Sequence, residues 1–216
     1  LPVNNPGNVV FSPDGTRAYV TANTTPTGRL CVINTATNTV IQTLVIGDSP
    51  TPMAVSPDGS KLYVASYASN NVQVFNTSNM SVLATIGTGV FPAGVVVSPD
   101  GSRLYVANNT SNTVSVVNTA TNTVINTIAV GTNPEGISIT GDGAFVYVVN
   151  SGTNNTMVIN TATNTVVKTI PVGSNPFSLG NFIAGTACAG TSKSFSVTVN
   201  PTPNAVATPD SQAVCS

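Results

Sequence analysis

The chain has 216 residues, of which only 6% are charged, and its six basic and seven acidic residues give a formal net charge of -1. This balance of charges predicts no basic patch that could bind nucleic acid. The absence of histidine removes the most common general base and a frequent metal ligand. No run of about 18 apolar residues is present, so no membrane-spanning segment is expected, and a surface made of Thr, Asn and Ser suits a protein that works outside the cell.

Two motifs are repeated along most of the chain. The first reads Asn-Thr-Ala-Thr-Asn-Thr in three of its four copies, which begin at residues 34, 76, 118 and 160, 42 residues apart. The second, Ser-Pro-Asp-Gly, begins at Ser12, Ser56 and Ser98 and becomes Thr-Gly-Asp-Gly at Thr140. Its first interval is two residues longer because the loop Thr24–Gly28 is extended. Internal repetition at about 40 residues is typical of solenoids and propellers.

Each copy contains four strand-like runs separated by turn residues. In the third copy these runs cover residues 94–97, 103–108, 113–117 and 123–130. Asp100-Gly101 supplies a tight turn after the first run, because glycine accepts a positive φ. No stretch has helical periodicity. The pattern predicts an all-β propeller of four-stranded antiparallel blades. The expected blades cover about 6–49, 50–91, 92–133 and 134–175, and the inner strand of another covers 177–183.

The first run of each copy is predicted to be the innermost strand of its blade. Bulky side chains do not fit near the crowded propeller axis, and small residues recur in these runs. They are Gly7, Ala54, Ala93, Gly94 and Gly136.

A tyrosine-containing strand follows each Asp-Gly turn. The four copies are Tyr19-Val20-Thr21, Tyr63-Val64-Ala65, Tyr105-Val106-Ala107-Asn108 and Tyr147-Val148-Val149-Asn150. Together with the two motifs above and Val-Gly-x-Asn-Pro, they make residues 1–183 resemble the YVTN β-propeller repeat family. The resemblance implies a propeller, usually seven-bladed, in surface-layer-like or large secreted proteins. It implies no single activity.

The number of blades leaves three alternatives open. Leu1–Pro6 is similar to Ile170–Pro176 less one residue, so the chain is expected to begin on the end of an earlier outer strand. The parent protein then has further blades, or four blades close into a small ring, or copies join their arcs into a larger assembly. An open arc exposes apolar blade faces. Protein partners or self-association through the terminal blades and the C-terminal tail are therefore expected.

The last thirty or so residues have a different composition. Residues 185–216 resemble the end of one Ig-like or PKD-like module and the start of another, which suggests a linker or a partial module. Cys188 and Cys215 flank this segment, and two alternatives remain: a disulfide between them in an oxidising setting, or pairing with a partner outside this sequence. Cys31 lies in an apolar run and is predicted to be a buried thiol.

Glu135 is the main candidate for contact with a ligand. It follows Asn133-Pro134 at the entry to an inner strand, so it is expected near the mouth of the central channel. No second acid, lysine or histidine is predicted beside it, and general acid–base catalysis then lacks a partner. Three other repeated sets are interpreted structurally: turn-forming aspartates, solvated basic residues and tyrosines between blades. They are Asp14, Asp58, Asp100 and Asp142; Arg17, Lys61 and Arg103; and Tyr19, Tyr63, Tyr105 and Tyr147.

These features favour a non-catalytic extracellular scaffold or adhesion module of a cell-surface or secreted protein. On this interpretation the chain is not an enzyme, no residue is assigned to catalysis or metal binding, and no cofactor is expected. The alternative is a propeller enzyme of the lactonase or lyase type that acts at the central channel.

Overall fold

The computed structural model describes residues 5–23 and 27–178, which form four antiparallel sheets of four strands each. Blade 1 contains β1 (Pro6–Phe11), β2 (Arg17–Ala22), β3 (Gly28–Asn34) and β4 (Thr39–Ile46); blade 2 contains β5 (Pro50–Val55), β6 (Lys61–Ser66), β7 (Asn71–Asn76) and β8 (Val82–Gly87). Blade 3 contains β9 (Pro92–Val97), β10 (Arg103–Asn108), β11 (Thr113–Asn118) and β12 (Thr123–Ala129); blade 4 contains β13 (Pro134–Ile139), β14 (Phe145–Asn150), β15 (Asn155–Asn160) and β16 (Thr165–Pro171).

The predicted all-β propeller of four-stranded blades is confirmed. Within every sheet the strands are hydrogen-bonded in chain order. The described ranges contain no helix, and so none long and apolar enough to cross a membrane. The predicted tail at 185–216, with Cys188 and Cys215, lies outside the described residues, as does most of the expected strand at 177–183.

The Asp-Gly turn between the first two strands of each blade is held by its own aspartate. In blade 2, the Ser56 hydroxyl donates to Asp58 Oδ1 at 2.5 Å and the Ser60 backbone N–H donates to the same oxygen at 3.0 Å. Gly59 completes the turn at φ 73°, a left-handed conformation that glycine adopts without strain. These bonds explain why Ser-Pro-Asp-Gly recurs.

The first threonine of the Asn-Thr-Ala-Thr-Asn-Thr motif ties the two turns of a blade together. The Thr77 hydroxyl donates to the Gly59 carbonyl at 2.6 Å, and Asn76 Oδ1 accepts the backbone N–H of Ser78 at 2.9 Å. The same threonine-to-glycine bond forms in the other three blades, from Thr35, Thr119 and Thr161. Both repeated motifs therefore lie at one end of the blades, where they lock the turns against each other.

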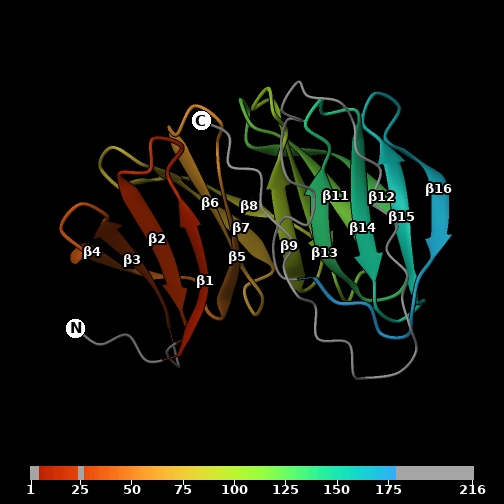
Figure 1. Cartoon of the computed structure of the whole chain (residues 1–216), viewed down its shortest axis with the longest axis horizontal. Helices are drawn as coiled ribbons and strands as arrows, with labels where there is room; N and C mark the ends of the chain where they lie inside the picture. The colour runs from red at the N-terminus through yellow and green to blue at the C-terminus, as the bar shows by residue number, and fades with distance from the viewer. Residues whose placement is uncertain (1–4, 24–26, 179–216) are drawn as a thin grey trace, which may run out of the picture.

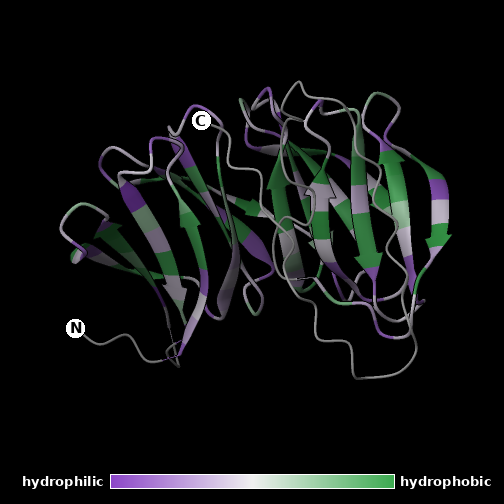
Figure 2. Ribbon diagram, in the orientation of Figure 1, coloured by the Kyte–Doolittle hydropathy of each residue, from purple (hydrophilic) through white to green (hydrophobic). Residues whose placement is uncertain are grey.

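Apolar side chains pack between consecutive blades and form three separate core clusters. Tyr19 belongs to the cluster between blades 1 and 2, Tyr63 to that between blades 2 and 3, and Tyr105 to that between blades 3 and 4. All three tyrosines are at most 1% exposed. Hydrophobic residues concentrate in the strands, and hydrophilic residues at their ends (Figure 2). Each joint between blades is thus a small hydrophobic core of its own.

The four blades form an open arc. The first strands lie side by side, β1 against β5, β5 against β9 and β9 against β13. Outer strands β4 and β16 lie at opposite sides of the molecule, with the first strands between them (Figure 1). Val9 and Phe11 of blade 1 are 53% and 60% exposed, so blade 4 does not cover them. The alternative of a closed four-bladed ring is therefore not realised in this structure.

Candidate functional site

A β-bulge interrupts the entry of each first strand. The ladder register shifts between Pro6 and Val9 in blade 1 and between Pro134 and Ile137 in blade 4, and the same irregularity occurs in blades 2 and 3. A bulge adds an unpaired residue and turns side chains away from the regular pleat. The four bulges lie around the propeller axis at one end of the blades and surround a cavity of about 110 Å³. Its lining includes residues 7–8, 51–53, 93–95 and 135–137, together with Tyr67 and Ser178.

Glu135 contributes the carboxylate of this cavity. Its side chain is half-buried, and the Asn109 Nδ2 group donates to its Oε1 at 2.8 Å. Burial raises the pKa of Glu135 above its ordinary value near 4.5, and the Asn109 hydrogen bond acts in the opposite direction. Asn109 is itself buried directly after β10. Asn109 thus binds one of the two carboxylate oxygens.

Tyr67 lines the cavity together with Glu135, and the ring of Phe91 packs on Tyr67. The rings of Tyr67 and Phe91 stack with centroids 4.2 Å apart and an interplanar angle of 13°. Burial raises the pKa of the Tyr67 phenol; the Thr51 hydroxyl lowers it and the Glu135 charge raises it further. The phenol therefore stays protonated at neutral pH and can act as a hydrogen-bond donor.

Phe91 has an uncommon backbone conformation. Its φ is 63°, in the left-handed region that a bulky side chain rarely adopts. The corresponding residues of the other blades, each directly before a proline, are Asn5, Ser49 and Asn133. Its backbone is held by the Asn70 side-chain oxygen, which accepts the Phe91 N–H at 2.9 Å, and by Asn109, whose N–H donates to the Phe91 carbonyl at 2.8 Å. Strain of this kind concentrates at functional sites.

The basic side chains that follow the Asp-Gly turns lie at the other end of the blades. Arg17 donates to the Thr77 carbonyl of blade 2, and Lys61 Nζ donates to the Thr119 carbonyl of blade 3 at 2.6 Å. Arg17 and Lys61 thus join neighbouring blades, whereas Arg103 donates to the Ser102 carbonyl of its own blade at 3.2 Å. All three side chains remain partly exposed to solvent. No lysine or arginine is among the residues that line the axial cavity. Among the described lining residues, Glu135 is the one with a charged side chain.

The remaining predicted residues have structural positions. Asp14, Asp58, Asp100 and Asp142 accept hydrogen bonds within their own turns. Among the residues that the model describes, no three acidic, cysteine or histidine side chains gather to hold a metal ion. Cys31 is buried and unpaired, with its sulfur 3.6 Å from the Thr43 hydroxyl. The structure places Glu135 in the axial cavity and the aspartates at the far end.

Sequence reasoning missed three residues of the site: Asn109, Tyr67 and Phe91. Asn109 and Tyr67 each follow a second strand, at positions that carry no shared motif. A signal did exist for Phe91, since an aromatic residue there departs from the Asn or Ser that precedes proline in the other copies. The stacked pair joins residues 24 positions apart and could not be inferred from local patterns.

The chain was compared with known families and structures. A family model described as "Lactonase, 7-bladed beta-propeller" matches residues 2–88 and 77–169. Hydrazine synthase from Kuenenia stuttgartiensis is similar, with a TM-score of 0.74 and 26% identity over 81% of this chain and 52% of that chain. A functionally unknown protein from Desulfotomaculum acetoxidans DSM 771 has a TM-score of 0.68 and 22% identity, covering 81% of this chain and 60% of that one. This chain therefore spans less than two thirds of either structure. No curated protein matches it.

These comparisons correct one expectation. The sequence predicted a chain that is not an enzyme, because it has no histidine and its carboxylates are dispersed. That prediction was wrong, since the family model and the hydrazine synthase structure both belong to enzyme-type propellers. The prediction was drawn from residue types alone, and the family match overrides it.

Proposed function

Because this chain belongs to the family of seven-bladed β-propeller lactonases, we propose that it hydrolyses a lactone at the axial cavity, with Glu135 as the general base. The observation that carries the proposal is the half-buried Glu135 carboxylate, which lies in the cavity with one oxygen held by Asn109. Fold alone does not determine an activity, so the argument depends on this site.

The proposed chemistry uses the side chains around the cavity. The Glu135 oxygen that Asn109 does not bind accepts a proton from a water molecule as the water oxygen attacks the lactone carbonyl carbon. The Tyr67 phenol, protonated at neutral pH, donates a hydrogen bond to the carbonyl oxygen as negative charge develops there. The ring C–O bond then breaks, and the departing alkoxide takes the proton from Glu135. The product is an open-chain hydroxy acid.

Replacing Glu135 with glutamine tests this assignment. Glu135→Gln keeps a side chain of the same size that Asn109 can still contact, but it cannot accept a proton from water. The rate of lactone hydrolysis, followed across a panel of five- and six-membered lactones, is expected to fall by about 10²–10⁴-fold. Asp142→Asn serves as the matched control, because Asp142 lies in the turn at the far end of blade 4. Equal activity in the two variants, or no hydrolysis by the unmodified chain, would overturn the proposal.

A second candidate function rests on the apolar ends of the arc. The exposed faces of blades 1 and 4, on a chain with few charges, support an interaction module of a surface or secreted protein. The YVTN resemblance points to the same location, outside the cell, and the partial Ig-like module would be part of a longer surface protein. Labelling of intact source cells with an antibody against this chain tests it: signal only after permeabilisation would reject an exposed location.

A further inference from the structure

The loop between blades 2 and 3 presents apolar side chains at a position that is polar in every other copy of the repeat. Phe91 is 41% exposed, and Val90 before it is 47% exposed. The residue that precedes the proline of the next first strand is Asn or Ser in the other copies: Asn5, Ser49, Asn133 and Asn175. This loop lies between two described blades, so its exposure does not depend on where the sequence begins or ends.

The requirements of the fold do not account for a phenylalanine at this position. All five copies have a positive φ here, and the value for Phe91 is 63°. Asn accepts this left-handed conformation far more readily than a bulky side chain does. An Asn would therefore form the same turn with less strain, and an exposed aromatic ring gains little from burial. The residue calls for an explanation outside the folding of the loop.

Phe91 is directly connected to the axial cavity. Its ring stacks on that of Tyr67, with centroids 4.2 Å apart, and Tyr67 lines the cavity together with Glu135. Asn109 makes a second connection, since its backbone N–H donates to the Phe91 carbonyl and its Nδ2 group donates to Glu135, each at 2.8 Å. We call Tyr67, Val90 and Phe91 the aromatic rim, an apolar surface that adjoins the cavity.

The cavity itself suits a small and uncharged group. Its volume of about 110 Å³ is well below the 300 Å³ or more of pockets that enclose a drug-sized ligand. Much of its lining is apolar, from Pro52, Met53, Val95 and Ile137, and no lysine or arginine is among the described lining residues. A ligand larger than one small ring would therefore extend past this space, and the aromatic rim is the apolar surface beside it.

We infer that the aromatic rim binds an alkyl side chain of the lactone whose ring lies next to Glu135. The inference rests on the proposed function for the reaction of the ring, whereas the binding of the side chain depends only on the rim. An alkyl chain that leaves the cavity beside Tyr67 would lie across the Phe91 ring and lose contact with water. The expected substrates are thus lactones with an alkyl side chain.

The experiment compares three γ-lactones that differ only in the side chain: none, ethyl or hexyl. For the unmodified chain, kcat/KM is expected to rise by about threefold for each of the first few CH₂ groups, so the hexyl lactone exceeds the unsubstituted one by about 100-fold. In Phe91→Asn this ratio is expected to fall to about 10 or less. The ratio cancels any loss of rate that both substrates share, such as a displacement of Glu135.

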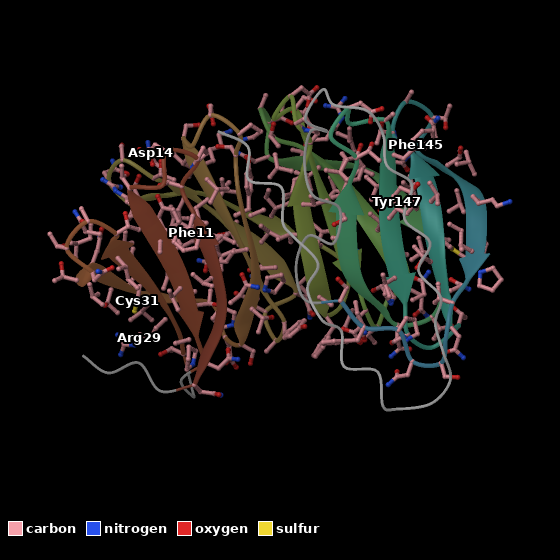
Figure 3. The ribbon with its side chains drawn as sticks, viewed as in Figure 1. Phe11, Asp14, Arg29, Cys31, Phe145 and Tyr147 are labelled. Carbon is pink, nitrogen blue, oxygen red and sulfur yellow. The ribbon has the colours of Figure 1, made fainter. Side chains whose placement is uncertain are left out.

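Phe91→Asn places in blade 3 the residue that blades 1 and 4 already carry as Asn5 and Asn133. The variant is therefore expected to fold, with a thermal unfolding midpoint at or above that of the unmodified chain. Phe145→Asn is the matched control. The Phe145 N–H donates to the Thr140 hydroxyl at 3.0 Å at an Asp-Gly turn, the end of the blades where Asp14 also lies (Figure 3). This control is expected to keep the ratio of the unmodified chain.

A binding measurement separates the rim from the reaction. γ-Lactams with the same side chains have an amide in place of the ester and resist hydrolysis, so their affinities can be measured by calorimetry. The affinity is expected to rise with side-chain length for the unmodified chain and for Glu135→Gln, and to lose most of this rise in Phe91→Asn. Glu135→Gln should at the same time lose lactone hydrolysis.

The outcomes distinguish the two proposals. Hydrolysis that is independent of side-chain length, or an equal ratio in Phe91→Asn and the unmodified chain, would refute the role of the rim and leave the proposed reaction in place. If no lactone is hydrolysed, the proposed reaction fails. A lactam affinity that rises with side-chain length only when Phe91 is present would then still support the rim, and an affinity that does not rise would refute it.

Discussion

At the scale of single residues, the turn aspartates show how a charge can serve the fold. The Ser56 hydroxyl, the Ser60 backbone N–H and the Ser60 hydroxyl hold the pKa of Asp58 down to about 2. A carboxylate that accepts several hydrogen bonds resists protonation, since the charged form is the one that is bound. The repeated Asp-Gly sequence is therefore a set of four anchored turns.

Replacing Asp58 with alanine should remove these bonds. The free energy of unfolding is expected to fall by about 1 kcal/mol at pH 7, a modest value because Asp58 is exposed to solvent. The folded pKa lies below the unfolded value of about 3.9, so the contribution is present above pH 4 and is lost as the pH falls toward 2. Urea unfolding of both proteins between pH 2 and pH 7 checks this. A difference that stays constant down to pH 2 would contradict the assignment.

Phe91, in contrast to the turn aspartates, has a backbone conformation that is energetically unfavourable by itself. A bulky side chain at φ 63° persists only where surrounding contacts impose it. Here the contacts are the stacked Tyr67 ring and the hydrogen bonds from Asn109 and to Asn70. Asn109 also holds Glu135, so one residue fixes both the strained aromatic and the carboxylate.

At the scale of elements, small residues in the first strands let blades approach closely. A Cβ atom added at Gly94 of β9 would lie 2.7 Å from the Glu135 carbonyl oxygen and 3.0 Å from the Ile137 Cγ2 atom of β13. The sequence predicted small residues here from crowding at the axis. The structure shows that the crowding occurs between two neighbouring bulges, next to the candidate site.

Substituting alanine for Gly94 should therefore force β9 and β13 apart. The free energy of unfolding is expected to fall by about 1–3 kcal/mol, as overpacking commonly costs. Lactone hydrolysis should fall too, because the shift would move Glu135. Gly87→Ala is the matched control: Gly87 ends β8, and an added Cβ atom would have nothing within 4 Å. Chemical denaturation measures the free energy of unfolding of both variants. Equal values would show that β9 and β13 do not approach each other tightly at Gly94.

The strands themselves were the most predictable elements. In the third copy, residues 94–97, 103–108, 113–117 and 123–130 were expected, and β9 to β12 cover these runs to within two residues at each end. Alternation and turn residues are local signals, and they are repeated here four times. The bulges were not predicted, since each depends on the register between two strands.

At the scale of the whole molecule, the same residue has a different environment at the middle and at the end of the arc. Tyr105 is buried between blades 3 and 4, whereas Tyr147 lies on the face of blade 4 that no other described blade covers and is partly exposed. Stability is therefore concentrated in the three inner joints. The two end faces contribute only when something covers them.

Two matched substitutions measure this difference. Tyr105→Ala is expected to lower the free energy of unfolding by about 3 kcal/mol, because it removes a large side chain from a packed joint. Tyr147→Ala is expected to cost less than about 1 kcal/mol, because Tyr147 is already partly exposed. Urea titrations of both variants test this, and equal losses of unfolding free energy would contradict the difference in packing.

The sequence by itself determined the strands, the turns, the blade order and the direction in which blades pack. These features arise from contacts within a repeat or between neighbouring repeats, so the sequence pattern that predicts them occurs four times at intervals of about 42 residues. Only the tertiary structure decided that Glu135 meets Asn109 and that Tyr67 stacks on Phe91. Each of these contacts involves residues that differ between the repeats. Such contacts depend on which blades lie side by side, so the repeated 42-residue pattern does not predict them.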